Sequence, residues 1–221
     1  MKRQGELWIF DMDGTLFQSE SVAVPAFRQT FTKMREAGVQ IPNDVTDQAI
    51  TGTFGYTHDH IWRTLIGESL EPQLQEKSDR WLIEAEIDLL QKGSGGLFPG
   101  VIETLKTLHE EGATLAVASN GQQSYIESIV QTFGIADWFA GLYSASGYRM
   151  ATKVDLVKLL LEEIDHDRAV MIGDRSSDIE AGMYNGLPAI GCVFGFADSH
   201  ELKGASMIVH HFSEILQFQF S

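Results

Sequence analysis

Short apolar runs recur along the chain, and each one stops at small or polar residues. They lie at 7–10, 114–118, 139–143, 169–172 and 189–193. A run of this length between turn residues is typical of a buried strand. Between them, apolar residues stand three and four positions apart, as in Val101, Leu105 and Leu108, which predicts amphipathic helices. We expect Pro99 at the start of that helix. Apolar strands that alternate with helices predict a parallel sheet covered on both faces.

One long segment breaks this alternation. From about Ser21 to Lys92 the pattern is helical without a convincing strand, and a glycine-rich connector follows at 93–96. We interpret residues 19–96 as an inserted all-helical cap domain. Residues 1–18 and 97–221 then form a Rossmann-like α/β core domain. Such an insertion, with a flexible joint on one side, is expected to act as a lid over one end of the sheet.

Charge and cysteine content exclude several classes of protein. The 221 residues include 31 acidic and 16 basic side chains, for a net charge of −15. This charge opposes binding to nucleic acid and to anionic membranes. No apolar run is long enough to span a bilayer, and the first one is too short for a signal peptide, so we expect a cytoplasmic protein. The single cysteine, Cys192, excludes an intramolecular disulfide.

Carboxylates collect where the predicted strands end. Asp11 and Asp13 follow the first strand, Asp174 follows the fourth, and Asp178 comes four residues later, in the first turn of a helix that is expected to begin near Ser176. Ligands of open parallel sheets bind beyond these strand ends. Converging carboxylates repel one another unless a cation lies among them, and oxygen ligands suit Mg²⁺. The pattern predicts a magnesium-assisted reaction on a phosphate.

Four motifs, in this order and spacing, resemble those of the haloacid dehalogenase-like superfamily of phosphohydrolases. They are Asp11-Met12-Asp13-Gly14-Thr15-Leu16, Ser119-Asn120, Lys153, and Gly173-Asp174-Arg175-Ser176-Ser177-Asp178. Together they span almost the whole chain outside the helical block, which lies where this superfamily inserts its C1 cap. The segment 97–100 also looks like that of the phosphoglycolate phosphatase-like branch.

The resemblance implies a role for each motif residue. Asp11 would be the nucleophile that forms an aspartyl-phosphate, and Asp13 would be the general acid and then the base. Ser119 and Asn120 would bind the phosphoryl group, and Lys153 would neutralise its charge.

The resemblance also implies a set of metal ligands. Asp174, the Asp11 carboxylate and the Asp13 backbone carbonyl would bind Mg²⁺, with Asp178 holding a metal-bound water or capping its helix. The sequence departs from the family after Lys153, because Lys153-Val154-Asp155-Leu156 stands where Lys-Pro-x-Pro is usual. Lys158 is the substitute for Lys153 if the loop places that lysine elsewhere.

Substrate choice is assigned to the cap. Its polar, glycine-punctuated loop at 52–60 includes Tyr56, and Arg63 follows on the next helix. Arg63 would clamp a carboxylate or second phosphate, or else be an ordinary exposed arginine. We interpret His58 and His60 as surface residues. The loop 194–198 is expected to lie beside the predicted site and is a further candidate for contact with the substrate.

We therefore expect a magnesium-dependent phosphatase that acts on a small phosphorylated metabolite such as phosphoglycolate or a sugar phosphate, as a monomer or homodimer. Three alternatives stay open. One is a phosphomutase of the β-phosphoglucomutase type, and another is a nucleotidase or pyrophosphatase. The third is a non-catalytic, receiver-like phosphate sensor, although receivers lack the Asp13 acid and an insertion of this length.

Overall fold

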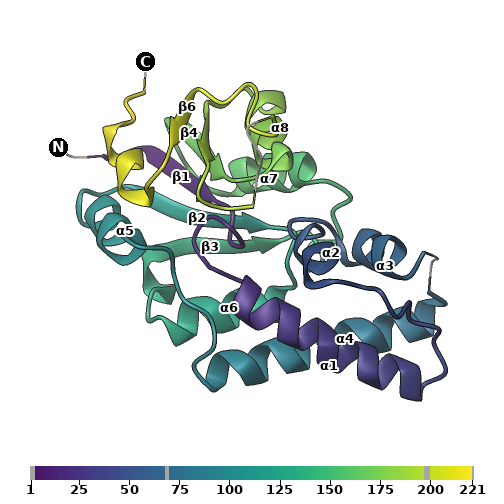
Figure 1. Ribbon diagram of the computed structural model, residues 1–221. Coiled ribbons are helices and arrows are strands. Elements are labelled where there is room, and N and C mark those ends of the chain that lie inside the picture. Colours follow the sequence, from purple (N-terminus) through teal and green to yellow (C-terminus); the bar gives the residue numbers. More distant parts are fainter. Residues whose placement is uncertain (1–2, 68–69, 197–199, 221) are drawn as a thin grey trace. The chain divides into compact units, whose positions relative to one another are not determined.

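The computed structural model describes residues 3–67, 70–196 and 200–220. Internal contacts divide the chain into two compact units (Figure 1). The first consists of Met1–Gln18 and Gly96–Ser221, and the second is Ser19–Gly95. The sequence had placed Gly96 with the second unit. Gly96 joins the first unit because its carbonyl accepts a hydrogen bond from the Gln18 amide at 2.8 Å.

The first unit is built on a parallel sheet. Within the described residues the sheet has six strands in the order β3-β2-β1-β4-β5-β6. Their bounds are β1 Glu6–Phe10, β2 Thr114–Ser119, β3 Phe139–Ser144, β4 Arg168–Gly173, β5 Ala189–Cys192 and β6 Met207–Val209. The predicted α/β parallel-sheet fold is confirmed. The strand order reverses around β1, which pairs with β2 on one side and β4 on the other.

Helices cover both faces of this sheet. They are α5 Val101–Glu110, α6 Gln123–Thr132, α7 Lys153–Glu163 and α8 Ser176–Tyr184, with short 3₁₀ turns η1 Ala136–Trp138 and η2 Phe212–Gln217. α5 and α6 lie on one face, and α7 and α8 on the other (Figure 1). This arrangement follows from right-handed crossovers on the two sides of β1.

Alternate residues of β1 supply the two layers of the core. Leu7 and Ile9 belong to one apolar cluster with Leu156 of α7. Phe10 points to the opposite face, where its ring lies 5.9 Å from that of Phe212 in η2. All of these side chains are buried. The continuous apolar run at 7–10 therefore reflects a central strand that is buried on both faces.

Two local predictions differ from the structure. Pro99 lies in the turn before α5 and not at its first position, because Gly100 between them has a φ of 84° and interrupts the helical conformation. The sequence pattern also missed β6, which has three residues and stands at the sheet edge. A strand this short, with the exposed Ile208 at its centre, gives no clear apolar run.

Among the described residues of the second unit, 19–67 and 70–95, helices joined by turns are found and no strand. It contains α1 Glu20–Glu36, α2 Asp47–Thr51, α3 His58–Ile66 and α4 Pro72–Gln91. α1 packs along α4 (Figure 1). The ring of Phe27 lies 6.0 Å from that of Phe31 and 5.6 Å from that of Trp62, and all three are buried. These rings form the centre of a separate apolar core.

Helix α4 shows the polar character of this unit. α4 has 20 residues and carries charged side chains such as Lys77 and Arg80 along its length. No helix among the described residues combines the length and the apolar character needed to cross a membrane.

Candidate active site

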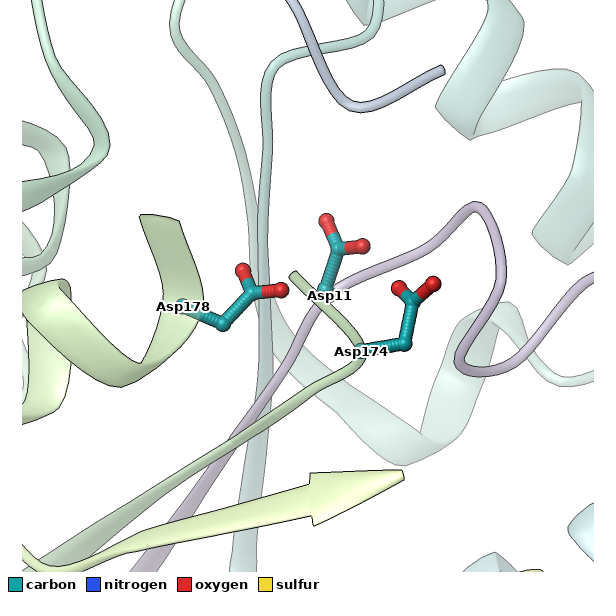
Figure 2. A group of neighbouring side chains, drawn as sticks. All are labelled: Asp11, Asp174 and Asp178. Carbon is teal, nitrogen blue, oxygen red and sulfur yellow. The ribbon is translucent and has the colours of Figure 1, made fainter. Parts of the chain in front are cut away.

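Three buried carboxylates meet at the carboxyl edge of the sheet. Asp11 directly follows β1, Asp174 directly follows the neighbouring β4, and Asp178 lies in the first turn of α8 (Figure 2). Each offers one oxygen, and these oxygens lie within 4.8 Å of one another. Helix α8 begins at Ser176, as the sequence predicts. The spacing of four residues thus brings Asp174 and Asp178 to the same place.

Asp178 is held by the turn that precedes its helix. Its Oδ2 accepts the backbone N–H of Arg175, the residue at the helix N-cap, at 2.9 Å. Gly173 provides the space, because a Cβ at that position would overlap the Asp178 side chain. The side chain thus caps α8, as one of its two interpretations predicts, and it also faces the other carboxylates.

Lys153, the first residue of α7, reaches into the carboxylate group. Its Nζ donates to Asp11 Oδ1 and to Asp178 Oδ1, both at 2.6 Å, and the residue is 3% exposed. Lys158, the substitute, is exposed. In place of the prolines of the family's Lys-Pro-x-Pro loop, α7 has a helix N-cap: Thr152 Oγ1 accepts the Asp155 N–H at 3.1 Å. This cap fixes the start of α7 and thereby the position of Lys153.

Asp174 is held by two loops. Its Oδ2 accepts the Phe196 N–H at 2.6 Å, and its Oδ1 accepts the Thr15 hydroxyl at 3.3 Å. Gly14, at a φ of 85°, and Gly195 both pass so close that a Cβ on either would overlap the Asp174 carboxylate. Phe196 belongs to the loop predicted to lie beside the site. Residues 197–198 of that loop lie outside the described residues.

Burial dominates the electrostatics of this group. Burial raises the pKa of Asp11 well above its usual range, against the opposing effect of Lys153, and Asp178 and Asp174 raise it further. Burial and then the Asp178 charge raise the pKa of Asp174 to about 7. Burial lowers the pKa of Lys153, but Asp11 and Asp178 outweigh it, so the net shift is upward and the ammonium stays protonated. One ammonium faces three carboxylates, which leaves the group short of positive charge.

The donor set fits a hard divalent cation. Asp11 Oδ2 is buried and has no hydrogen-bond partner. An orphaned carboxylate oxygen is costly in a protein interior unless a cation or ligand contacts it. Because the neighbouring groups also offer carboxylate oxygens, the site suits Mg²⁺ better than a soft metal.

Asp13 lies in the turn after Asp11 and is half-buried. Its Oδ1 accepts a hydrogen bond from the Tyr125 hydroxyl at 3.0 Å. Sequence analysis missed Tyr125, because a tyrosine in the first turn of an amphipathic helix gives no signal of its own. The contact joins residues 112 positions apart and depends on the packing of α6 beside the β1 loop.

Ser119 and Asn120 come to the same edge of the sheet. Ser119 ends β2, which runs parallel to β1 with Phe10 opposite Val117. Its hydroxyl oxygen accepts the Gly121 N–H at 3.0 Å, and Asn120 is half-buried beside it. The structure thus brings the predicted phosphate-binding pair to the strand end next to Asp11 and Asp13.

The predicted substrate residues of the cap belong to the helical unit. Arg63 pairs with Asp59 on its own helix at 3.1 Å, and the ring of Tyr56 lies 4.4 Å from that of His60. Their contact with a substrate stays a prediction.

One interpretation of this unit is wrong. His58 is not a plain surface histidine: its Nδ1 lies 2.9 Å from Asp79 Oδ1, and its side chain is 13% exposed.

Comparisons with known proteins agree with this arrangement. Residues 8–192 match the family model of the haloacid dehalogenase-like hydrolases. The chain belongs to the haloacid dehalogenase-like hydrolase family.

Individual relatives are similar over most of the chain. A phosphoglycolate phosphatase of Vibrio vulnificus is 28% identical over 200 residues, covering 86% of this chain and 85% of the relative. The tyrosine-protein kinase PtkA of Mycobacterium tuberculosis is 28% identical over 213 residues, covering 93% of this chain and 68% of the relative. The crystal structure of CbbY from Rhodobacter sphaeroides in complex with xylulose-(1,5)bisphosphate is 25% identical, with a TM-score of 0.80 and 95% of each chain covered. These findings confirm the predicted resemblance to the phosphatases of this family and the prediction that the chain is an enzyme.

Proposed function

We propose that this enzyme is a magnesium-dependent phosphatase that hydrolyses a small phosphomonoester through a phosphoryl group on Asp11. The observation that carries this proposal is the environment of Asp11. Its Oδ1 is held by the Lys153 ammonium, its Oδ2 is buried without a hydrogen-bond partner, and Asp174 and Asp178 adjoin it. A carboxylate fixed in this way is preorganised to attack and is not a surface-exposed acid.

Asp11 acts as the nucleophile and Asp13 as the acid and base of a two-step reaction. In the first step an Asp11 oxygen bonds to phosphorus, the bond from phosphorus to the ester oxygen breaks, and Asp13 gives its proton to the leaving alcohol. In the second step water bonds to phosphorus and passes a proton to Asp13, while the bond from Asp11 to phosphorus breaks. Inorganic phosphate leaves, and both carboxyls return to their starting states.

Lys153 supports both steps. Its ammonium lies between Asp11 and Asp178, and these carboxylates hold its pKa above the usual range. It therefore remains a cation at every pH of interest, where it orients Asp11 and neutralises charge on the transferring phosphoryl group. Ser119 and Asn120 would donate hydrogen bonds to the same phosphoryl oxygens.

The acidic group would hold Mg²⁺. Asp11, Asp174 and the Asp13 backbone carbonyl would bind the ion directly. Asp178 would act through a water, because its two oxygens already accept from Lys153 and from the Arg175 N–H. The ion supplies positive charge that offsets the carboxylates and the phosphate ester.

Two relatives favour a small substrate. One relative is named for phosphoglycolate, and another was crystallised with a sugar bisphosphate. The helical unit would select among such esters through Tyr56 and Arg63. The net charge of −15 opposes long-range capture of an anion, so attraction depends on Lys153 and the bound cation at the site.

Phosphoryl transfer to a second hydroxyl is the alternative on the same scaffold. The relative named as a tyrosine-protein kinase supports this alternative, which includes a phosphomutase with the same Asp11 chemistry. The two outcomes differ in the acceptor. A phosphatase gives one inorganic phosphate per ester consumed, whereas a transferase keeps the phosphoryl group on carbon-bound oxygen.

The test is phosphate release from phosphoglycolate, sugar phosphates, nucleoside monophosphates, pyrophosphate and p-nitrophenyl phosphate, with magnesium and with EDTA. We expect release that requires magnesium and is abolished in Asp11→Asn. The matched control is Asp137→Asn, at an exposed aspartate in η1. Activity that persists in Asp11→Asn contradicts the assignment of the nucleophile, and release that is unaffected by EDTA contradicts the metal.

A further inference from the structure

The hydroxyl of Tyr125 contacts the proposed acid and base of the reaction. Tyr125 lies in the first turn of α6, two residues inside a helix that begins at Gln123, and it is 4% exposed. Its hydroxyl donates to Asp13 Oδ1 at 3.0 Å. A donor in this position orients one oxygen of the carboxyl. Because the carboxyl group is planar, the direction of its other oxygen is then fixed as well.

The Tyr125 ring also packs on the turn that carries Asp13. It lies 6.4 Å from the ring of Phe17, at an interplanar angle of 77°. Phe17 is joined to Asp13 by a β-bridge, and its carbonyl accepts the Gly14 N–H at 2.9 Å. Tyr125 therefore contacts the Asp13 side chain through its hydroxyl and the Phe17 ring of the same turn through its own ring, so its position and that of the carboxyl are coupled.

The second Asp13 oxygen faces the end of β2. A Cβ built on Gly121 would lie 3.7 Å from Asp13 Oδ2, 3.3 Å from Ser119 Oγ and 3.5 Å from the Tyr125 ring. These three groups thus converge on Gly121. Oδ2 therefore lies near Gly121, whose N–H donates to the Ser119 hydroxyl oxygen of the proposed phosphoryl-binding pair.

We propose that Tyr125 is a positioning residue for Asp13. Its hydroxyl holds Oδ1, so Oδ2 is the oxygen that carries the proton to the leaving alcohol and later takes the proton of water. The inference rests on the proposed function and adds to it a residue that positions the general acid. A freely rotating carboxyl presents its proton in the productive direction only part of the time, and a fixed one gains rate through orientation.

The nature of the leaving group separates this role from a structural one. An alkyl phosphate releases a poor leaving group that needs the proton from Asp13. The p-nitrophenolate ion is a good leaving group and needs little protonation. The ratio kcat/KM reports the steps up to release of the leaving group, so it isolates the transfer in which Asp13 is the acid.

The experiment compares Tyr125→Phe with Tyr143→Phe. Tyr125→Phe keeps the ring packed on Phe17 and removes the hydroxyl. Tyr143 is the matched control, because it is also buried and its hydroxyl donates to a carboxylate, Glu163 Oε2, at 2.9 Å, away from the acidic group. Both variants are assayed with p-nitrophenyl phosphate and with phosphoglycolate, or with the sugar phosphate that the wild type hydrolyses fastest.

We expect Tyr125→Phe to lower kcat/KM for the alkyl phosphate by about ten- to a hundredfold and that for p-nitrophenyl phosphate by less than about threefold. Tyr143→Phe should leave the ratio between the two esters unchanged. In an Asp13→Asn background, Tyr125→Phe should have no further effect on the residual activity, because both changes remove the same function.

Equal losses for both esters, or a full Tyr125→Phe effect in the Asp13→Asn background, would overturn the inference. Turnover by the wild type tests the proposed phosphatase activity, whereas the ratio between the two esters tests Tyr125. An active wild type with an unchanged ratio in Tyr125→Phe overturns only the positioning role.

Discussion

The ammonium of Lys153 donates to Asp11 Oδ1 at 2.6 Å, and both side chains are almost completely excluded from solvent. The pair joins the start of α7 to the end of β1, across 142 positions of sequence. It holds the proposed nucleophile in one orientation and supplies the positive charge nearest to it. Most of the predictions below follow from this ion pair and from the carboxylates around it.

Replacing Lys153 by methionine should lower both activity and stability. We expect kcat to fall by about a hundredfold or more, because a preorganised cation at the phosphoryl group is lost. The free energy of unfolding should fall by about 3–5 kcal/mol near neutral pH in EDTA, since Asp11 and Asp178 remain buried without their partner. Lys158→Met, at an exposed position on the same helix, is the control in urea unfolding and activity assays. Equal effects of the two variants would show that the buried pair has no special role.

Stability without metal should decrease as pH rises from about 4 to about 7. Burial raises the pKa of Asp174 to about 7 from an ordinary 3.8, so in this window the folded state binds more protons than the unfolded state. Raising the pH then favours unfolding, and Mg²⁺ should oppose this by binding the ionised form. The increase in melting temperature produced by magnesium should be larger at pH 8 than at pH 5. Asp174→Asn should flatten the pH dependence, and a magnesium effect that is the same at both pH values contradicts the account.

Gly14→Ala should weaken magnesium dependence through a steric effect on Asp174. A Cβ at Gly14 would overlap the Asp174 carboxylate, and its φ of 85° adds backbone strain. We expect the magnesium concentration for half-maximal activity to rise by about tenfold or more. Gly134→Ala separates the two causes, because Gly134 also has a positive φ, of 67°, but open space around its Cβ position. If Gly134→Ala has the same effect on the magnesium requirement, strain and not the position of Asp174 is responsible.

Arg63 is predicted to recognise a second anionic group of the substrate. Arg63→Met should raise KM for phosphoglycolate by about tenfold, the cost of one charge-assisted hydrogen bond, and leave KM for p-nitrophenyl phosphate nearly unchanged. Arg80→Met is a close control: Arg80 is 60% exposed and pairs with Glu76 one helix turn away, and Arg63 is 59% exposed and pairs with Asp59. Because such exposed pairs add little to stability, both variants should fold normally. If the two variants have identical KM values for phosphoglycolate, Arg63 is an ordinary surface residue.

The sequence predicts the parts of the fold and site that depend on local pattern. The strand at 7–10 is continuous in apolar residues because β1 is buried on both faces, and the carboxylates at its end and after β4 come together because parallel strands end at one edge. Because α8 begins at Ser176, the four-residue spacing of Asp174 and Asp178 brings their side chains together.

Long-range packing accounts for what the sequence left open. Lys153 reaches Asp11 without the usual prolines because the Thr152 side chain caps its helix. The threonine before Lys153 is a local sign of this cap, but comparison with the Lys-Pro-x-Pro motif draws attention only to the missing prolines. The hydrogen bond from the Phe196 amide to Asp174 could not be predicted, since any residue type offers a backbone N–H. Tyr125 was missed for a related reason: its contact with Asp13 depends on how α6 packs on the β1 loop, and a single tyrosine does not reveal that packing.

The measurement that tests the central claim most directly is chemical trapping of the phosphorylated residue. The wild type is mixed with its best phosphate ester and magnesium, quenched in acid during turnover and divided into two samples. One sample is digested directly for mass spectrometry, and the other is reduced with borohydride before digestion. Our account predicts a phosphoryl group on the Asp11 peptide, with hydride reduction of that acyl phosphate to homoserine at this position, and neither product in Asp11→Asn. Turnover with no modification at Asp11, or with the phosphoryl group on another residue, would contradict the account.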